Sequence, residues 1–136
     1  MKRTITRIIA MLYLFSLEIN EESKLNDIIN MIDEEVEYDE EFLWTIINGV
    51  RENIDELDHI ISRYLKKYTI ERLNLVDKNL MRIGVYEMKY LKTPTPIIIN
   101  EIVEISKEYS DLDNYEAAKF NNSLLDSIAM GLNNGK

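Results

Sequence analysis

The sequence predicts an all-α fold of about seven helices. Apolar residues recur every three to four positions from one end of the chain to the other, which is the period of a helix with one buried face. Only 4 glycines and 2 prolines occur among the 136 residues, so tight turns are few and sheet-rich folds are disfavoured. No polar linker long enough to separate two domains interrupts the pattern, and we therefore expect residues 1–136 to form one domain.

The first two helices are predicted in the N-terminal third of the chain. The apolar stripe of the first helix contains Ile5, Ile8, Ile9, Leu12 and Phe15. The second helix is expected over about residues 22–35, where the stripe contains Leu25, Ile28, Ile29 and Ile32. The acidic joint at residues 37–40 ends this helix and places negative charge at the start of the next one, where the helix dipole favours it.

The middle of the chain predicts three more helices. A long third helix is expected over residues 42–65, because the apolar period continues through the whole segment and Gly49 does not interrupt it. Thr69 opens a short fourth helix, and the fifth covers residues 77–91. Gly84 lies inside the fifth helix, where a glycine costs about 1 kcal/mol relative to alanine, so we expect a neighbouring helix to approach closely there.

The last two helices follow a joint that contains both prolines. Residues 93–96 read Thr-Pro-Thr-Pro, and proline disfavours helix before it but suits the first turn after it. The stripe of the sixth helix contains Ile98, Ile102, Ile105 and Tyr109. Residues 111–114 form the last joint, and Gly131 is expected to cap the final helix. The stripe of that helix contains Ala117, Phe120, Leu124, Leu125 and Ile128.

Charge is distributed unevenly along the chain. The net charge is −9, but 15 of the 25 acidic residues lie between residues 18 and 58, together with only two basic residues, Lys24 and Arg51. The other residues therefore carry a net positive charge, so this acidic protein can still present a basic face to an anionic partner. The alternative is that each cluster of charges is only a solvated surface.

The N-terminus has part of the pattern of a secretory signal. Lys2, Arg3 and Arg7 accompany an apolar run over residues 8–15, but no small residues follow at the cleavage positions and the run is too short to span a bilayer. We interpret the segment as an amphipathic helix of the mature protein. Because the chain has no cysteine, which fits a reducing compartment, we expect a cytoplasmic protein without a membrane segment.

The sequence indicates neither a metal site nor an active site. Glu56 and His59 have the spacing found in ferritin-like diiron helices, but such a site needs two such motifs and this chain has one histidine. Glu101, Glu104 and Glu108 share a helix face, but carboxylates alone specify no reaction, so we expect a solvated face. No phosphate-binding loop or nucleophile motif is present, and we expect a protein without enzymatic activity or cofactor.

Aromatic residues beside cations are the clearest indication of a ligand. Single-stranded RNA is held by stacking of its bases on aromatic rings together with contacts to its phosphates. Tyr64 lies between Arg63 and Lys66, and Phe120 follows Lys119. The alternative is a place in the core, because most aromatic residues at helical spacing are buried and Phe120 fits the apolar stripe of its helix.

Three segments in the second half of the chain resemble motifs of the NusB family of transcription antitermination factors. Residues 77–88, DKNLMRIGVYEM, resemble the signature helix of that family. Residues 99–107, INEIVEISK, are similar to its I-N-E-x-x-E-x-x-K helix, and residues 119–126, KFNNSLLD, are similar to its K-F-V-N-G-V-L-D motif. Weaker similarities occur at residues 12–13 and 48–50, so the resemblance covers essentially the whole chain.

The resemblance implies two packed subdomains of three to four helices and a protein without catalysis. It further implies that the protein pairs with the ribosomal protein that acts as NusE, and that the pair binds the boxA element of nascent ribosomal RNA. Such binding supports processive transcription in a complex with RNA polymerase. By position, the resemblance places RNA contacts at Lys2, Arg3, Arg7, Tyr13, Tyr64, Lys119, Phe120 and Asn122. It places the partner-protein surface at Asp77, Arg82 and Glu87, whose charges would lie at a polar interface rim.

The chain departs from the family pattern at both ends. Family members often have four or more arginines before the first apolar stripe, whereas this chain has two cations followed by Ile5 and Thr6, which implies weaker RNA binding by the chain alone. Ala118, Asn121 and Ser123 replace a frequent histidine, valine and glycine, so the RNA-facing end of the last helix is altered.

Two alternatives to an RNA-binding antitermination factor are open. One is a helical protein-interaction module that has kept the scaffold and lost RNA binding. The other is the appended domain of a NusB-like RNA cytosine methyltransferase, which we do not expect because 136 residues leave no room for a catalytic domain. The sequence also leaves open whether the free protein forms a homodimer.

Overall fold

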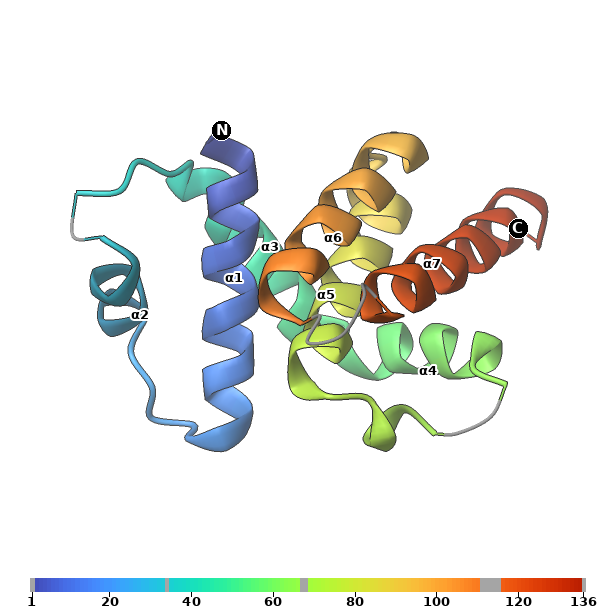
Figure 1. Ribbon diagram of the computed structural model, residues 1–136, viewed down its shortest axis with the longest axis horizontal. Helices are drawn as coiled ribbons and strands as arrows, with labels where there is room; N and C mark the ends of the chain where they lie inside the picture. Colours follow the sequence, from blue (N-terminus) through green and yellow to red (C-terminus); the bar gives the residue numbers. More distant parts are fainter. Residues whose placement is uncertain (1, 34, 67–68, 111–115, 136) are drawn as a thin grey trace.

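The computed structural model describes residues 2–33, 35–66, 69–110 and 116–135, and every regular element in these ranges is helical (Figure 1). In chain order the elements are α1 (Lys2–Ile19), α2 (Leu25–Ile32), α3 (Glu40–Glu52), α4 (Ile54–Tyr64), the 3-10 turn η1 (Ile70–Arg72), α5 (Leu75–Tyr86), the π-helical turn η2 (Glu87–Leu91), α6 (Thr95–Tyr109) and α7 (Glu116–Gly135). The prediction of an all-α fold with about seven helices is confirmed.

Helix α5 occupies the centre of the molecule. Helices α1, α3, α4, α6 and α7 all pack against it (Figure 1). Because α5 has neighbours on all sides, its residues from Asn79 to Tyr86 are buried without exception, rather than in a single stripe. The helices α1 to α3 form one group and α4, α6 and α7 form the other, and one continuous apolar core runs through both.

Gly84 has the packing role that the sequence predicts. A Cβ atom at this position would lie 3.2 Å from Cδ2 of Leu125 on α7 and 3.5 Å from Cγ1 of Ile102 on α6. The first distance is shorter than an ordinary van der Waals contact between carbon atoms. The absence of a side chain at Gly84 therefore lets α6 and α7 approach α5 closely.

The long helix predicted over residues 42–65 is wrong, because two helices meet at Asn53. The side chain of Asn53 donates a hydrogen bond to the carbonyl oxygen of Gly49 at 2.8 Å, and its backbone N–H lies 3.2 Å from the carbonyl oxygens of both Gly49 and Val50. Asparagine side chains that bond to nearby backbone compete with continuation of a helix, so Asn53 was the signal in the sequence. The break allows α3 to pack on α1 and α5 while α4 packs on α5 and α7.

The helix predicted over residues 77–91 changes from an α-helix to a π-helical turn at Glu87. Helix α5 ends at Tyr86 and the chain continues as the π-helical turn η2, after which Lys92 adopts a left-handed backbone conformation with φ 58° and ψ 30°. The backbone N–H of Thr93 donates to the carbonyl oxygen of Glu87 at 3.1 Å. A π-helical turn is rare and is found frequently at functional sites. Here it precedes the joint that leads into α6.

Two further helix ends differ from the sequence prediction, and one predicted joint lies outside the described residues. Helix α2 ends at Ile32, three residues before the predicted end. Helix α7 continues to Gly135, so Gly131 does not cap it. The predicted joint at residues 111–114 lies outside the described residues.

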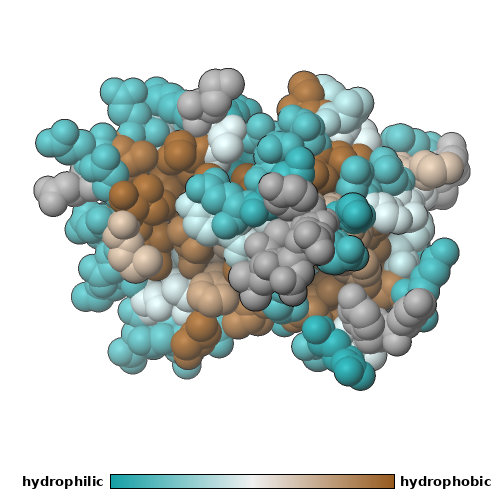
Figure 2. Space-filling model, viewed as in Figure 1, coloured by the Kyte–Doolittle hydropathy of each residue, from teal (hydrophilic) through white to brown (hydrophobic). Residues whose placement is uncertain are grey.

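Helix α1 is an amphipathic helix of the folded protein, as predicted. Its residues from Thr6 to Met11 and Leu14 are buried against the other helices. None of the helices in the described ranges has both the length and the apolar character needed to cross a membrane. Figure 2 shows apolar surface over the side of α1 and α2 and hydrophilic surface along the outer rim.

Candidate nucleic-acid interface

Tyr64 and Phe120, the two predicted stacking residues that flank cations, line the same hollow. Tyr64 is the last residue of α4 and Phe120 lies near the start of α7, and these two helices pack against each other. The hollow has a volume of about 400 Å³. It is completed by Leu65, Lys66, Ser123, Leu124 and Ser127. Both aromatic side chains are half-buried, so each packs on the core and still has accessible surface.

A glycine on α7 positions the ring of Tyr64. A Cβ atom at Gly131 would overlap the hydroxyl oxygen of Tyr64 and would lie 2.7 Å from its Cζ atom. Only glycine leaves room for the ring in this position, so Gly131 is a packing position and not the predicted helix cap. Tyr64 also lines a second and larger hollow, of about 850 Å³, between α4 and α7.

Lys119 and Asn122, the other predicted contacts on α7, lie beside the hollow of Tyr64 and Phe120. Both are exposed and line a shallow depression of about 380 Å³ that shares Ser123 and Ser127 with that hollow. The depression also contains the carboxylate of Asp126. The structure thus brings three predicted RNA contacts on α7 next to Tyr64.

Lys2 and Arg3 lie on a separate surface at the start of α1. A hollow of about 650 Å³ is formed there between α1 and the joint that leads into α6, and Lys92 belongs to its lining. The guanidinium carbon of Arg3 lies 3.8 Å from the centroid of the Phe42 ring, and its Nε atom lies 3.7 Å from the carboxylate of Asp39. The Arg3 side chain is still 60% exposed, which leaves it accessible to a phosphate. The predicted RNA contacts therefore fall on two surfaces.

Arg7, which was predicted as an RNA contact, borders the hollow of Lys2 and Arg3 but is itself buried in the fold. Its side chain is 4% exposed, and its Nε and Nη2 atoms donate to the two carboxylate oxygens of Glu87 at 2.6 and 2.8 Å. Its Nη1 atom donates to Glu101 at 2.9 Å. Burial opposes the charge of Arg7, but the hydrogen bonds and charge of Glu87, together with those of Glu101, outweigh burial and raise the pKa of Arg7. Arg7 therefore joins α1 to η2 and α6.

Arg82 and Glu87, which the resemblance places at the polar rim of a partner interface, are both buried. Glu87 is fully buried and also accepts a hydrogen bond from the hydroxyl of Thr93 at 2.9 Å. Arg82 donates to the two carboxylate oxygens of Asp58 at 2.7 Å each and to Glu18 at 3.1 Å. Burial again opposes the charge, but Asp58 and then Glu18 raise the pKa of Arg82. The charge of Arg82 thus connects α5 to α4 and to the end of α1.

Asp77, the third predicted partner contact, is also buried. Its carboxylate accepts hydrogen bonds from Ser110 at 2.6 Å, from Asn121 at 2.9 Å and from Asn74 at 2.9 Å. The amide of Asn121 also donates to the hydroxyl of Ser106 at 2.8 Å. Asn121, which the sequence suggested as a change at an RNA-facing end, therefore faces the interior. These contacts connect the start of α5 to the end of α6 and the first turns of α7.

Tyr13 and the pair Glu56 and His59 are the remaining candidates from the sequence. Tyr13 is half-buried against the core and lines none of the hollows described above. Glu56 accepts a hydrogen bond from the hydroxyl of Tyr90 and forms an ion pair with Lys89 at 2.9 Å. Both contacts lower the pKa of Glu56, and the hydrogen bond from Tyr90 has a larger effect than the contact with Lys89. Among the residues that the structure describes, no group of three His, Asp or Glu side chains is placed to hold a metal ion, and His59 is exposed.

The fold and these surfaces define a small all-helical protein with aromatic rings and cations gathered between α4 and α7. The chain belongs to the NusB family, whose model matches residues 4–130. It is 37% identical over 130 residues to the transcription antitermination protein NusB of Staphylococcus aureus (strain JH9), and the match covers 94% of this chain and 98% of that relative.

Two solved structures of the family superpose on the whole fold. NusB of T. maritima has a TM-score of 0.80 at 34% sequence identity, with 96% of this chain and 92% of that chain covered. A crystal structure of the antitermination factors NusB and NusE in complex with dsRNA has a TM-score of 0.79 at 26% identity, with 94% and 96% covered.

Proposed function

We propose that this chain is a transcription antitermination factor that binds boxA-type single-stranded RNA together with the ribosomal protein acting as NusE, and so supports processive transcription of ribosomal RNA operons. The observation that carries the proposal is the placement of Tyr64 and Phe120 in one hollow, with the exposed Lys119 in the depression beside it. Rings for base stacking and cations for phosphates are the two components that single-stranded RNA recognition needs. The family relatives, which include a complex of NusB and NusE with dsRNA, support both the RNA and the partner protein.

In this proposal each of the two surfaces contacts a different part of the RNA. Tyr64 and Phe120 stack on bases, while Lys119 and Asn122 contact the RNA backbone beside them. Lys2 and Arg3 contact phosphates at the start of α1 and are the remaining N-terminal cations, since Arg7 is engaged inside the fold. The partner protein then uses surface other than the side chains of Asp77, Arg82 and Glu87, all of which are buried.

Two further properties follow from this role. Binding and presenting an RNA requires no bond to be made or broken, so the proposed function is that of an adaptor without catalysis or cofactor. Nascent ribosomal transcripts are made in the cytoplasm of bacteria, so we propose that the protein acts there, in the complex with RNA polymerase.

A titration of labelled boxA-like RNA with the protein, with and without the partner protein, tests the proposal. We expect saturable binding that weakens as salt increases and strengthens when the partner is present. Replacement of Tyr64 by alanine should weaken binding by roughly 1–3 kcal/mol, the usual contribution of one stacked base. Trp44→Ala is the matched control, because Trp44 is an exposed ring on α3. The same sequence annealed into a duplex should bind more weakly, since its bases are not free to stack.

The second candidate function is a helical protein-interaction module that has lost RNA binding. The burial of Arg7 favours it, because it removes one of the three N-terminal cations from the surface. Under this alternative the protein would bind the partner protein, and RNA would neither bind to the pair nor strengthen it. The same titration therefore separates the two functions.

A further inference from the structure

The larger hollow between α4 and α7 has features that the proposed stacking site does not use. It has a volume of about 850 Å³. Its lining from α4 and the residues that follow it consists of Glu56, His59, Ile60, Arg63, Tyr64 and Lys66. On the other side it is lined by Lys89 of η2 and by Ser127, Met130, Gly131 and Leu132 of α7. Tyr64, Lys66 and Ser127 also line the smaller hollow, so the two hollows adjoin along these three residues.

The lining of the larger hollow is cationic although the protein as a whole is acidic. It contains Arg63, Lys66 and Lys89 against the single carboxylate of Glu56, on a chain with a net charge of −9. Lys89 is paired with Glu56 at 2.9 Å. Arg63 and Lys66 are exposed, and no carboxylate in the described part of the chain lies within ion-pairing distance of either. Two cations therefore face solvent without a partner from those residues.

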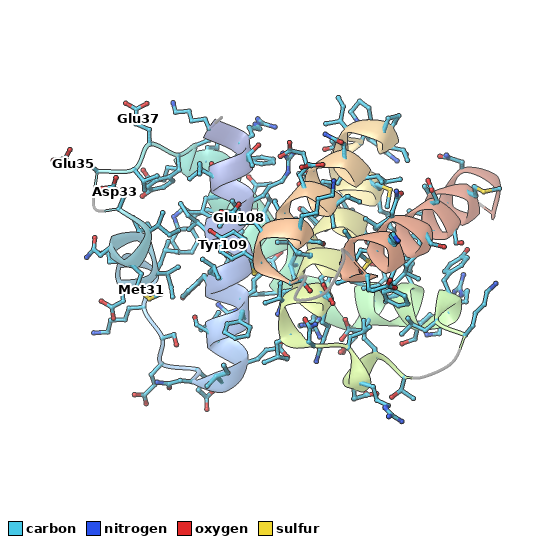
Figure 3. All side chains as sticks on the ribbon, in the orientation of Figure 1. Met31, Asp33, Glu35, Glu37, Glu108 and Tyr109 are labelled. Atoms are coloured by element: carbon cyan, nitrogen blue, oxygen red, sulfur yellow. The ribbon has the colours of Figure 1, made fainter. Side chains whose placement is uncertain are left out.

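Three acidic residues of the segment between α2 and α3 lie away from this hollow, whereas Glu56 is part of its lining. Asp33, Glu35 and Glu37 project from the segment between α2 and α3, on the opposite side of the molecule from α4 and α7 (Figure 3). Exposed charges separated by more than about 10 Å are largely screened at moderate salt, so the local cations decide which ligands approach the hollow. The potential in the hollow therefore favours an anion.

The order of side chains matches a nucleic-acid strand better than a small anion. Arg63 and Lys66 flank Tyr64 in sequence, and Tyr64 lines both hollows. An aromatic ring with cations beside it is the arrangement that holds a base together with its neighbouring phosphates. Ile60, Met130 and Leu132 add an apolar floor on which a second base can lie. The two hollows adjoin along Tyr64, Lys66 and Ser127, so a strand can pass from one into the other.

We propose that the RNA strand continues past Tyr64 into the larger hollow, and that Arg63 and Lys66 contact the phosphates of the nucleotides outside the segment stacked on Tyr64 and Phe120. This inference rests on the proposed function and extends it, because it assigns a second stretch of RNA to the face between α4 and α7. The number of nucleotides that the protein binds then depends on the face between α4 and α7. An acidic peptide is the competing ligand for the same cations.

The experiment compares Arg63→Gln/Lys66→Gln with the parent protein, using a short boxA-like RNA and the same RNA extended at both ends. Each lost phosphate contact lowers the slope of log affinity against log salt by about 0.7 for a single strand, so the double variant should lose about 1.4 on the extended RNA. The parent should bind the extended RNA more tightly than the short one, and the variant should bind both alike. Circular dichroism melts establish that the variant is folded, since surface substitutions of this kind change stability by only about 0.5 kcal/mol.

Lys24→Gln/Arg51→Gln is the matched control. Both residues are exposed cations in the acidic segment, without an ion pair to the described residues, so the charge change is the same and the position is different. The control should keep the parent's slope and its preference for the extended RNA. Lys89 stays unchanged in all variants because its removal would leave the carboxylate of Glu56 without its ion-pair partner.

The outcomes separate the inference from the proposed function. If Arg63→Gln/Lys66→Gln binds both RNAs with the slope of the parent while Tyr64→Ala weakens binding, the RNA does not enter the larger hollow and the proposed function stands. If the parent binds neither RNA, with or without the partner protein, both are overturned. Loss of binding to an acidic peptide in the double variant, with RNA binding unchanged, also overturns the inference.

Discussion

The hydroxyl group of Tyr64 lies on the surface of α7 at Gly131, where no other residue type leaves room for it. The two residues are 67 positions apart in the chain. Their contact fixes the ring at the boundary between two hollows. Gly131, which is not one of the proposed RNA contacts, thus determines where the stacking ring lies.

Gly131→Ala should weaken RNA binding without removing any proposed contact residue. The new methyl group displaces the Tyr64 ring, and the affinity should fall by up to roughly 1–3 kcal/mol, the usual contribution of a stacked base. Stability should change little, because alanine gains about 1 kcal/mol over glycine in a helix and a half-buried ring can move. A fluorescence titration together with a thermal melt measures both quantities.

A double-mutant cycle identifies the cause of that loss. If Gly131→Ala acts by moving the ring, it should have no further effect on RNA affinity in a protein that already contains Tyr64→Ala. An equal loss of affinity in both backgrounds would show that Gly131 acts on binding by another route.

Arg7→Ala should destabilise the fold strongly. The change leaves the fully buried carboxylate of Glu87 without its ion-pair partner, and removal of one partner from a buried pair costs about 3–5 kcal/mol. Urea denaturation measures the free energy of unfolding. Lys2→Ala is the control, since Lys2 is an exposed cation on the same helix and should change stability by only about 0.5 kcal/mol. Equal stability of the two variants would contradict the role assigned to Arg7.

Asp77→Ala should also destabilise the protein. Its removal takes away one of the two acceptors of the buried Asn121 amide and the acceptor of the half-buried Ser110 hydroxyl, and a buried polar group that loses its partner costs roughly 1–3 kcal/mol. The exposed Asp126 on α7 supplies the control variant Asp126→Ala. We expect the partner protein to bind both variants equally when they are folded, whereas a selective loss with Asp77→Ala would restore this residue to the partner surface.

Lys2→Gln and Arg3→Gln should each lower the salt dependence of RNA binding. Both side chains are exposed, and each phosphate contact contributes about 0.7 to the slope of log affinity against log salt on a single strand. Arg3 is also stacked on Phe42, so its variant tests an arginine that is held in place before RNA arrives. Affinities measured at four or five salt concentrations give the slope, and an unchanged slope in both variants would remove the start of α1 from the RNA surface.

Glu56→Gln should lower the pKa of Tyr90. The carboxylate of Glu56 accepts a hydrogen bond from the Tyr90 hydroxyl and, as a negative charge beside it, opposes loss of the phenolic proton, which raises the pKa of Tyr90. A neutral amide no longer opposes ionisation, so the Tyr90 resonances should shift at a lower pH in an alkaline NMR titration. A midpoint unchanged by the substitution would show that the contact does not persist in solution.

The apolar pattern predicts the helices well, because each stripe is a local property of the sequence. The break at Asn53 required attention to one side chain that bonds to its own helix, which a count of apolar positions does not detect. The π-helical turn at Glu87 has no corresponding local signal, since an α-helical period fits the same residues.

The charged residues were harder to assign from the sequence than the apolar ones. Arg7 forms its ion pair with Glu87, which lies 80 residues away in the chain, and Asp77 accepts a hydrogen bond from Asn121, which lies 44 residues away. The sequence around Arg7 or Asp77 therefore does not indicate that the side chain is buried. A charge on a helix looks the same in the sequence whether it faces water or an ion-pair partner. The sequence identifies Tyr64 and Phe120 as aromatic residues beside cations, but only the packing of α4 on α7 brings the two rings into one hollow.

The central position of α5 has a consequence for how the protein loses its structure. Since five helices from both groups pack on α5, neither group can separate without exposing apolar surface on this one helix. If the chain were divided at Asn53, α1 and α3 would lose the apolar surface of α5 on which they pack. Helix α5 would in turn expose the surface that α1 and α3 bury. The two halves are therefore not independent folding units, and unfolding is expected as a single all-or-none transition in which both RNA surfaces are lost together.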